Sequence, residues 1–402
     1  MRSRPVVITI AGSDSGGGAG LQADLKTFTS LGVFGTTVIT SLTAQNTFEV
    51  TNVLEVPPDF IAAQFDTIMK DFSPLYAKTG MLASRKIIDI VKEKVIQYGI
   101  KLVLDPVMVA KSGSSLISED IMPSLEGLLK ESLISTPNKF EAEIISGFKI
   151  ESPDDLMRSA RKIYEKYGNV IVKGGSYFNG LDVAVIDGNT IEVRGNKVET
   201  KNVHGSGDVF SAAITAYLAK GFPLLNSIKM AKEFVENSIA FSLDLGKGHG
   251  PVDPFSNPER KIAMEEAREE LEELLYILEK EKDYLPKLID DDEKANVAII
   301  TPYNDYATLA GGIIRYLEWT KLDGPILINP KKNTVVKALE ISSKRVGIKI
   351  SPTQTVIKSI ENGKVKISES GFNSDMVSID GKLVLVANST EELLSKIEMI
   401  LK

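Results

Sequence analysis

From the start of the chain to about Asp253, short apolar runs alternate with longer stretches of helical periodicity. The apolar runs include PVVITIAG, TTVITSLTA, LYAKTGML, KLVLDPVMV and NVIVKGG, and helical patterns such as LQADLKTFTSLG and ASRKIIDIVKEKVIQYG stand between them. Near-continuous Val, Ile and Leu strands are typical of a parallel sheet that helices cover on both faces. The alternation therefore predicts a doubly wound, mostly parallel α/β domain.

One stretch of this region has a different pattern. In LDVAVIDGNTIEVRGNKVET, two alternating runs flank an Asp-Gly pair. Asp-Gly between alternating runs is typical of a tight hairpin turn. We therefore expect an antiparallel hairpin near one edge of the sheet.

The character of the sequence changes near Pro254. Residues 257–294 are highly charged, with Leu and Ile at helical spacing, and predict a helical linker packed through one apolar stripe. Beyond them, strands are expected in NVAIITPY, GPILINP and KLVLVAN, followed by a final helix in STEELLSKIEMILK. The expected parts are an α/β domain at 1–256, a charged linker at 257–294 and a smaller α/β domain at 295–402.

Charge and composition exclude several classes of protein. The net charge is −7, which argues against a nucleic-acid surface, since such surfaces are normally basic. The 402 residues include two histidines and no cysteine, which excludes disulfides, thiolate nucleophiles and cysteine metal sites. No apolar stretch has the length of a membrane span or a signal peptide. We expect a cytoplasmic protein with no membrane or nucleic-acid partner.

A first glycine cluster, AGSDSGGGAGLQADLK, ends a strand and opens a helix, the usual place of a ligand-binding loop in such a sheet. It is not the dinucleotide fingerprint, because Leu21 stands where the third glycine belongs, and this disfavours a dehydrogenase. The phosphate-binding loop Gly-x-x-x-x-Gly-Lys-Ser/Thr is absent from the sequence. Taken alone, the cluster fits either a ligand loop or a flexible turn.

A second glycine cluster, HGSGD, runs directly into a helix. Backbone N–H groups of Gly205, Ser206, Gly207 and Asp208 at such a helix start form an anion cradle. A transferring phosphoryl group needs donors of this kind, and the Asp208 carboxylate is able to accept the proton of an attacking hydroxyl. The alternative is an ordinary helix-start aspartate favoured by the helix dipole.

Polar residues also follow a predicted strand in STPNKFEAEIISG. Asn138, Glu141 and Glu143 stand where this strand passes into a helix. Such groups can order Mg²⁺ and its waters, although glutamate in a first helical turn is also common.

Two further segments offer cations for a nucleotide. Lys173 ends the strand in VIVKGG, within reach of a phosphate, and LGKGHGPVDP holds Lys247 and His249. We interpret the second segment as another wall of a nucleotide site. A solvated lysine and a surface loop are the alternatives, and neither histidine of the chain has a metal-ligand spacing.

These segments, in this order, resemble the ribokinase-like hydroxymethylpyrimidine/phosphomethylpyrimidine kinases of thiamine biosynthesis. The matching motifs are ITIAGSDSGGGAGLQADLKTF, VITSLTAQNT, KTGMLAS, LVLDPVMVAKSG, STPNKFEAE, VIVKGG, HGSGD and GKGHGP, and the resemblance extends from Val6 to Val252. It implies a ribokinase-like fold. It also implies that Mg²⁺-ATP phosphorylates 4-amino-5-hydroxymethyl-2-methylpyrimidine and then its monophosphate.

The resemblance also assigns residues to the substrates. It implies a pyrimidine pocket lined by Gly12, Ala19, Asp24, Gln45, Met81 and Val107. In that pocket Asp24 and Gln45 would bond the aminopyrimidine edge. It implies a Mg²⁺–phosphate side and an ATP side that hold Asp105, Asn138, Glu141 or Glu143, Lys173, Lys247 and His249.

One position departs from the family pattern. These kinases commonly carry cysteine where this chain has Asp208, the aspartate of the wider ribokinase-like superfamily. A carboxylate is a competent base. The departure puts in question how the two phosphorylations are discriminated, and whether pyridoxal-like alcohols are also accepted.

The C-terminal part weakly resembles the thiamine-phosphate synthase domain that is fused to this kinase in some archaea and bacteria. Its glycine-serine-arginine-histidine segment has no counterpart here, and no histidine follows His249. We expect a binding, regulatory or structural domain. The alternatives are a bifunctional kinase–synthase and a ligand-sensing protein on a kinase fold, and a homodimer or higher homo-oligomer is expected.

Overall fold

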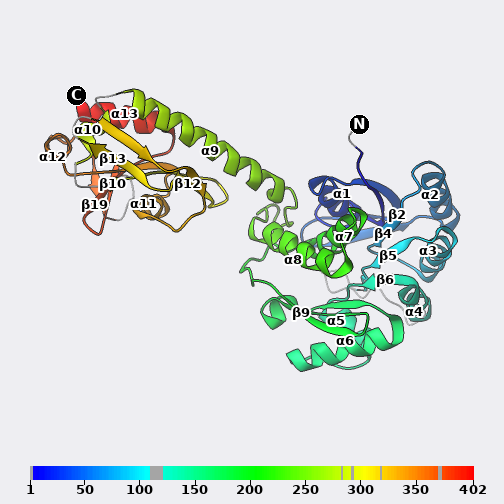
Figure 1. Ribbon diagram of the computed structural model, residues 1–402. Helices are drawn as coiled ribbons and strands as arrows, with labels where there is room; N and C mark the ends of the chain where they lie inside the picture. The colour runs from blue at the N-terminus through cyan, green and yellow to red at the C-terminus, as the bar shows by residue number, and fades with distance from the viewer. Residues whose placement is uncertain (1–2, 109–120, 282–283, 291–293, 317–318, 370–373) are drawn as a thin grey trace. The chain divides into compact units, whose positions relative to one another are not determined.

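The computed structural model describes residues 3–108, 121–281, 284–290, 294–316, 319–369 and 374–402 (Figure 1). Over these residues the chain forms two compact units, Met1–Asn257 and Pro258–Lys402. The strands of the first unit are β1 (Val6–Asp14), β2 (Phe34–Gln45), β3 (Val50–Glu55), β4 (Tyr76–Thr79), β5 (Lys101–Leu104), β6 (Ser132–Ser135), β7 (Val170–Lys173), β8 (Leu181–Ile186) and β9 (Asn189–Arg194). Its α-helices are α1 (Gly20–Ser30), α2 (Pro58–Asp71), α3 (Arg85–Tyr98), α4 (Met122–Glu131), α5 (Lys139–Ser146), α6 (Pro153–Tyr167), α7 (Ser206–Ala219) and α8 (Leu224–Ala240).

All nine strands form one sheet in the order β3-β2-β1-β4-β5-β6-β7-β8-β9. The neighbours from β2 to β7 in this order pair in parallel. At the edges the pairing is antiparallel, between β3 and β2, between β8 and β7, and between β9 and β8. The order reverses at β1, because β1 pairs with β2 on one side and with β4 on the other. In sheets of this type ligands bind at such a switch point, beyond the carboxyl ends of the strands.

Alternating strand residues fill two cores on opposite faces of the sheet. Leu102 and Leu104 pack with helices α2, α3, α4 and α6, whereas Val103, between them, packs with α7 and α8. Since successive side chains of a strand point to opposite faces, both faces of the sheet are buried. This confirms the predicted α/β fold with a mostly parallel sheet covered on both faces.

The predicted hairpin is also present, as β8 and β9 at one edge of the sheet. Its two-residue turn consists of Asp187 and Gly188, with φ of 50° and 81°. Positive φ at both turn positions matches the right-handed twist of the flanking strands, which explains the Asp-Gly pair.

The second unit contains a mainly antiparallel seven-stranded sheet and a separate three-stranded sheet. The larger sheet comprises β15 (Ile326–Ile328), β12 (Tyr306–Leu309), β11 (Val297–Ile300), β16 (Val346–Ile350), β19 (Lys382–Ala387), β18 (Met376–Ile379) and β17 (Ile367–Ser368). The smaller sheet comprises β10 (Lys294–Ala295), β13 (Gly312–Tyr316) and β14 (Trp319–Asp323). The helices of the unit are α9 (Ser256–Lys280), α10 (Tyr284–Leu288), α11 (Thr334–Ser342), α12 (Gln354–Glu361) and α13 (Thr390–Leu401).

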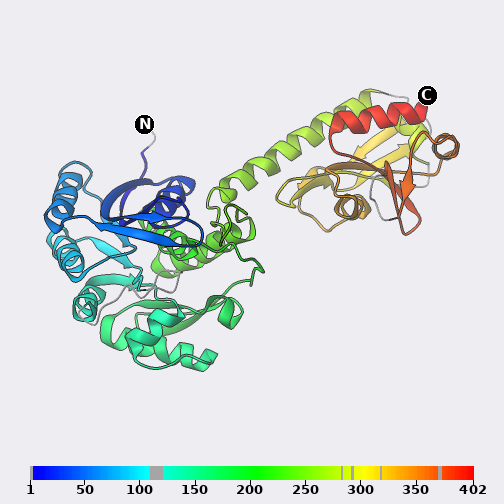
Figure 2. The same ribbon diagram turned by 180° about the vertical axis from the view of Figure 1, so that it is seen from behind.

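The long helix α9 lies in the stretch expected to be a linker. Its apolar stripe, which includes Leu271, Leu274 and Leu278, is buried in the core of the second unit with Leu393 and Ile397 of α13. In both views α13 lies beside the later part of α9 (Figures 1 and 2). The stripe therefore packs α9 into the second unit, and this helix is more than a solvated connection.

Among the helices of the described ranges, none combines the length and the apolar character needed to cross a membrane.

Candidate active site

Two glycine turns meet at the switch point of the first sheet. One follows β1 and leads into α1, and the other leads into α7, whose N-cap is Gly205 with φ of 80°. A Cβ atom at Gly205 would lie 1.9 Å from the carbonyl oxygen of Gly18, and a Cβ at Gly18 would lie 2.5 Å from the His204 ring. Both turns require glycine, because Gly205 packs against the backbone of Gly18 and Gly18 packs against the His204 ring.

Asp14, at the end of β1, organises the first glycine turn. Its carboxylate accepts hydrogen bonds from the N–H groups of Gly16, Gly18 and Ala19 at 2.7, 3.0 and 2.9 Å, and it contacts His204 Nε2 at 3.2 Å. Burial alone would raise the pKa of Asp14, but the hydrogen bonds from His204, Gly16 and Ala19 outweigh it and hold that pKa below its ordinary value. Asp14 thus connects the β1–α1 turn to the residue that precedes the second turn.

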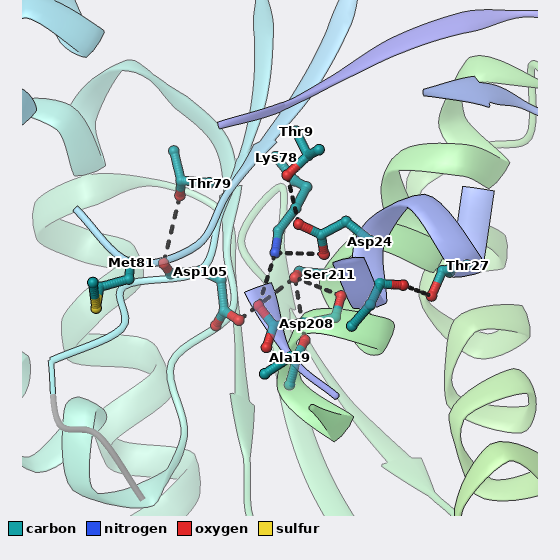
Figure 3. Close-up of polar contacts among 12 residues, drawn as sticks. Thr9, Ala19, Asp24, Thr27, Lys78, Thr79, Met81, Asp105, Asp208 and Ser211 are labelled. Carbon is teal, nitrogen blue, oxygen red and sulfur yellow. Dashed lines mark hydrogen bonds and ion pairs between the residues drawn. The ribbon is translucent and has the colours of Figure 1, made fainter. Parts of the chain in front are cut away.

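A buried ion-pair triad lies behind the second turn (Figure 3). Lys78 Nζ at the end of β4 donates to Asp24 Oδ1 of α1 at 2.8 Å and to Asp208 Oδ1 of α7 at 3.2 Å. The side chains of Lys78 and Asp24 are fully buried, whereas that of Asp208 is 16% exposed. Asp208 is therefore the member of the triad that a substrate can reach.

The role implied for Asp24 differs from its place in the structure. Its second carboxylate oxygen accepts from Thr9 Oγ1 at 2.5 Å, and burial raises the pKa of Asp24 to about 7 against the opposing effect of Lys78. Asp24 has no exposed surface, and its carboxylate oxygens already bond Lys78 and Thr9, so its expected bond to a pyrimidine stays a prediction.

A second ion pair stands on the other side of the α7 start. Asp105, just beyond β5, accepts from Lys173 Nζ and from Thr136 Oγ1, each at 3.0 Å. A Cβ at Gly207 would lie 3.4 Å from Lys173 Nζ and 3.6 Å from Asp105 Oδ2, so this pair adjoins the helix start. Burial alone would lower the pKa of Lys173, but the charges of Asp105 and Glu141 raise it overall, which keeps the ammonium protonated.

Asn138 and Glu141 form a capping box at the start of α5. The Asn138 side chain accepts from the N–H groups of Phe140 and Glu141, and Glu141 Oε2 accepts from Asn138 N at 2.8 Å. Burial raises the pKa of Glu141 to about 7, opposed by the charge of Lys173. The structure thus brings Glu141 into the electrostatic environment of Lys173 and Asp105.

Glu143 is placed elsewhere. Its carboxylate binds Lys139 at 2.7 Å, Lys149 at 3.2 Å and the N–H of Ile150 at 2.9 Å. Burial would raise the pKa of Glu143, but these hydrogen bonds lower it to about 2. Its contacts tie α5 to the following loop, because Glu143 lies two residues beyond Glu141 on a helix and so on a different side.

The remaining pyrimidine-pocket candidates lie around the ends of β1, β2, β4 and β5. A Cβ at Gly12 would lie 3.4 Å from the Met81 side chain, so these two residues are neighbours. Gln45 Nε2 lies 3.4 Å from His204 Nε2, and Val107 is half-buried beyond β5. Ala19 is the N-cap of α1, beside the triad in Figure 3.

The segment with Lys247 and His249 packs on the turn between β2 and β3. The N–H groups of Gly248 and His249 donate to Thr47, and His249 Nδ1 contacts the Lys201 carbonyl oxygen at 2.8 Å. Both Lys247 and His249 are exposed. The loop thus adjoins the turn that follows Gln45, and its expected nucleotide role stays a prediction.

Asp14, His204 and Lys78 were not singled out from the sequence as site residues. Lys78 carried a signal, because it interrupts the apolar strand LYAKTGML with a charge that burial must pair. Asp14 stood beside serines and glycines in a turn, where aspartate is common for local reasons.

Comparisons with known proteins assign the first unit to a family. The family model described as phosphomethylpyrimidine kinase matches residues 14–253. The chain belongs to the phosphomethylpyrimidine kinase family. A hydroxymethylpyrimidine/phosphomethylpyrimidine kinase of Haemophilus influenzae is 43% identical over 262 residues, which cover 62% of this chain and 96% of the relative. The first unit is thus a kinase domain of thiamine biosynthesis with a pyrimidine and ATP as its ligands.

Other similar proteins extend the comparison. The thiamine biosynthesis bifunctional protein ThiED of Geobacter sulfurreducens is 42% identical over 254 residues, covering 62% of this chain and 52% of that protein. A Bacillus subtilis pyridoxal kinase solved as an ADP complex superposes with a TM-score of 0.60 at 34% identity, covering 64% of this chain and 99% of that one. A Clostridium difficile phosphomethylpyrimidine kinase superposes with a TM-score of 0.53 at 36% identity, covering 59% of this chain and 100% of that one. The family match ends at residue 253, so the second unit keeps no assignment from it.

Proposed function

We propose that Asp208 is the base for phosphorylation of the pyrimidine hydroxymethyl group, and that the backbone N–H groups of residues 205–208 hold the transferred phosphoryl. The supporting observation is the place of Asp208. It is the exposed member of a buried ion-pair triad and the third residue of helix α7, whose start is the positive end of the helix dipole. A base and an anion cradle thus stand on one turn of one helix.

The first transfer moves one proton and one phosphoryl group. The substrate O–H bond breaks as Asp208 accepts the proton, the oxygen forms a bond to the γ-phosphorus of ATP, and the bond to the β-phosphate oxygen breaks to release ADP. Negative charge spreads over the transferring oxygens, where oriented N–H groups stabilise it. In the second transfer a phosphate oxygen of the monophosphate attacks a second ATP. This oxygen carries no proton above about pH 6, the second pKa of a phosphate ester.

On the nucleotide side, Lys173 is the expected phosphate contact, with Asn138, Lys247 and His249 as further ATP-side candidates. A Mg²⁺ ion fits Asp105 and Glu141, two carboxylates that are 3% and 4% exposed beside Lys173. Mg²⁺ usually takes one or two carboxylates together with substrate phosphates and water. Within the described ranges no group of three or more His, Cys, Asp or Glu residues is able to hold a metal. When bound, the ion neutralises charge on the phosphates.

The test is Asp208→Asn, assayed with hydroxymethylpyrimidine and Mg²⁺-ATP. Removal of a general base costs about 10²–10⁴-fold, and we expect the first phosphorylation to fall within that range. A thermal melt that matches the wild type excludes loss of the fold. A folded variant that keeps most of its first-step turnover would show that Asp208 is not the base.

Pyridoxal is a second candidate substrate. The observation that favours it is the superposition with pyridoxal kinases, among them a Staphylococcus aureus enzyme solved with AMP-PCP and pyridoxal at 31% identity and a TM-score of 0.59. The same assay with pyridoxal tests whether it is a substrate. A kcat/KM equal to that for hydroxymethylpyrimidine would mean a dual-substrate kinase.

For the second unit we propose a binding, regulatory or structural role, because no histidine follows His249 to serve the synthase chemistry. Thiamine phosphate formed on addition of thiazole phosphate would instead establish a bifunctional enzyme. A homodimer or higher homo-oligomer is also proposed. It is supported by the exposed Leu42, Val53 and Leu54 on β2 and the edge strand β3, and light scattering after gel filtration tests it.

A further inference from the structure

Lys78 is a fully buried charge of the site, and its contacts join three separate elements. Its side chain lies on β4, with no exposed surface, and its ammonium bridges Asp24 on α1 and Asp208 on α7. A buried ammonium costs several kcal/mol unless it is paired, so its position needs a reason beyond local packing. The bond to Asp208 connects this buried group to the one carboxylate of the triad with access to substrate.

The other end of the triad is anchored. Asp24 accepts from both Lys78 and Thr9 of β1, and its side chain is fully buried. Because Asp24 is held in place by these bonds and Lys78 is fully buried beside it, the position of the ammonium is fixed by β1, β4 and α1. Its hydrogen bond then sets the direction of the Asp208 carboxylate.

The surrounding charges leave this task to Lys78. The nearby Lys173 ammonium donates to Asp105 Oδ1, and the charges of both residues act on Glu141. Burial would lower the pKa of Lys78, but the charges of Asp24, Asp208 and Asp105 raise it overall. Lys78 therefore stays a protonated donor while Lys173 is engaged with Asp105.

We propose that Lys78 is the positioning residue for Asp208, needed for the first phosphorylation and dispensable for the second. The inference rests on Asp208 acting as the base. Only the first transfer has a proton to remove, so a group that acts by orienting the base affects that step alone. A group that merely supports the fold would affect both transfers, since both use the same phosphoryl cradle.

The test compares the two steps in one folded variant. Lys78→Met alone would leave the buried Asp24 carboxyl without its ion-pair partner, so it is combined with Asp24→Asn. First-step kcat is measured with hydroxymethylpyrimidine and second-step kcat with its monophosphate. Since misplacement of a reacting group by about 1 Å costs about 10²-fold, we expect a first-step loss of about 10- to 100-fold. KM and second-step kcat should change by less than about threefold.

A second double variant keeps a hydrogen-bond donor near Asp208. Lys78→Gln with Asp24→Asn retains an N–H group at this position. Its first-step kcat should be at least about fivefold higher than that of the Met double variant, since a neutral hydrogen bond keeps part of the orienting effect. The ratio of the two steps in this variant decides the question if the Met variant melts early. The matched control is Lys94→Met, which removes another buried lysine. Lys94 of α3 pairs with Asp66 of α2 at 2.6 Å, and neither helix carries a site residue. It should leave the ratio of the two steps unchanged.

Equal losses in both steps, or a first-step kcat within about threefold of the wild type, would overturn the role of Lys78. Failure of the underlying assignment has a separate signature. If Asp208→Asn itself keeps its first-step turnover, Asp208 is not the base and the positioning role falls with it. If Asp208→Asn is inactive in the first step while both Lys78 double variants remain fully active, only the role of Lys78 is refuted.

Discussion

Replacement of Asp14 by asparagine should disturb both glycine turns, because this one carboxylate receives three backbone N–H groups and contacts His204. Gly16 donates to one oxygen, and Gly18 and Ala19 donate to the other. An amide keeps one acceptor oxygen, so its NH₂ group must face at least one of these N–H donors. A buried donor left without an acceptor costs about 1–3 kcal/mol, and bonds to a charged acceptor are at the upper end.

We therefore expect Asp14→Asn to lower the free energy of unfolding of the kinase unit by about 2–4 kcal/mol, or its midpoint by about 5–10 °C. The effect should depend on pH in one direction. The pKa of Asp14 lies below its ordinary value of 3.8 in the folded protein, so its contribution is complete above that value and is lost as pH falls through the folded pKa. The gap between variant and wild type should therefore be full at pH 7 and narrow only under strongly acidic conditions.

The assay is denaturant unfolding of the full chain, reading the transition that ATP shifts, together with KM for the pyrimidine. KM should rise because two pyrimidine-pocket candidates would be displaced. Ala19 belongs to the disturbed turn, and Gln45 lies beside His204. The control is Asp155→Asn, which removes a carboxylate from the capping box of α6 on the surface and should cost less. Equal stability for the Asp14 variant and the wild type at pH 7, with an unchanged KM, would refute the reasoning.

Four further outcomes are expected. Gly205→Ala should abolish both phosphorylations, measured as ADP release, because its Cβ would collide with the Gly18 carbonyl oxygen 1.9 Å away. Glu143→Gln should keep kcat and its Mg²⁺ dependence while lowering the melting temperature, since Glu143 binds Lys139 and Lys149; a changed Mg²⁺ dependence would return it to the metal side. A chain cut after Asn257 should keep kinase kcat within about threefold, because each unit has its own core, and a larger loss would give the second unit a part in catalysis. Chelation of Mg²⁺ should stop turnover, measured directly as formation of the phosphorylated pyrimidine, and unchanged turnover would show that Asp105 and Glu141 hold no required cation.

The sequence was sufficient for the main features of the kinase unit because they rest on local rules. Strand runs of Val and Ile, helix periodicity between them and the Asp187–Gly188 turn each follow from the backbone preferences of a few adjacent residues. The glycine of the α7 N-cap was also recognisable, since a turn into a helix start is a local pattern. These signals predicted where the candidate site lies.

The pairing of charges was not predictable in the same way. Lys78 meets partners 54 and 130 residues away in the chain, and no local pattern encodes which carboxylate a buried lysine will find. Asp24 was assigned to the pyrimidine pocket by resemblance, and no local pattern indicated that its side chain would be buried against Lys78. The second unit was harder still, because strands as short as Lys294–Ala295 and Ile367–Ser368 carry too few residues to show a period.

The arrangement of charge has a consequence for the nucleotide. Lys78 is shared between Asp24 and Asp208, and Lys173 is paired with Asp105, so the two buried ammonium groups are already balanced by carboxylates before ATP binds. These two ammonium groups therefore offer little uncompensated positive charge to a phosphate chain that enters the site. Other sources are the N–H groups at the start of α7, the candidate Lys247 and any cation that binds with the nucleotide. An aspartate at position 208 adds one more negative charge than a neutral cysteine thiol would, so the N–H groups at the start of α7 and a cation bound with the nucleotide become more important for holding the phosphates.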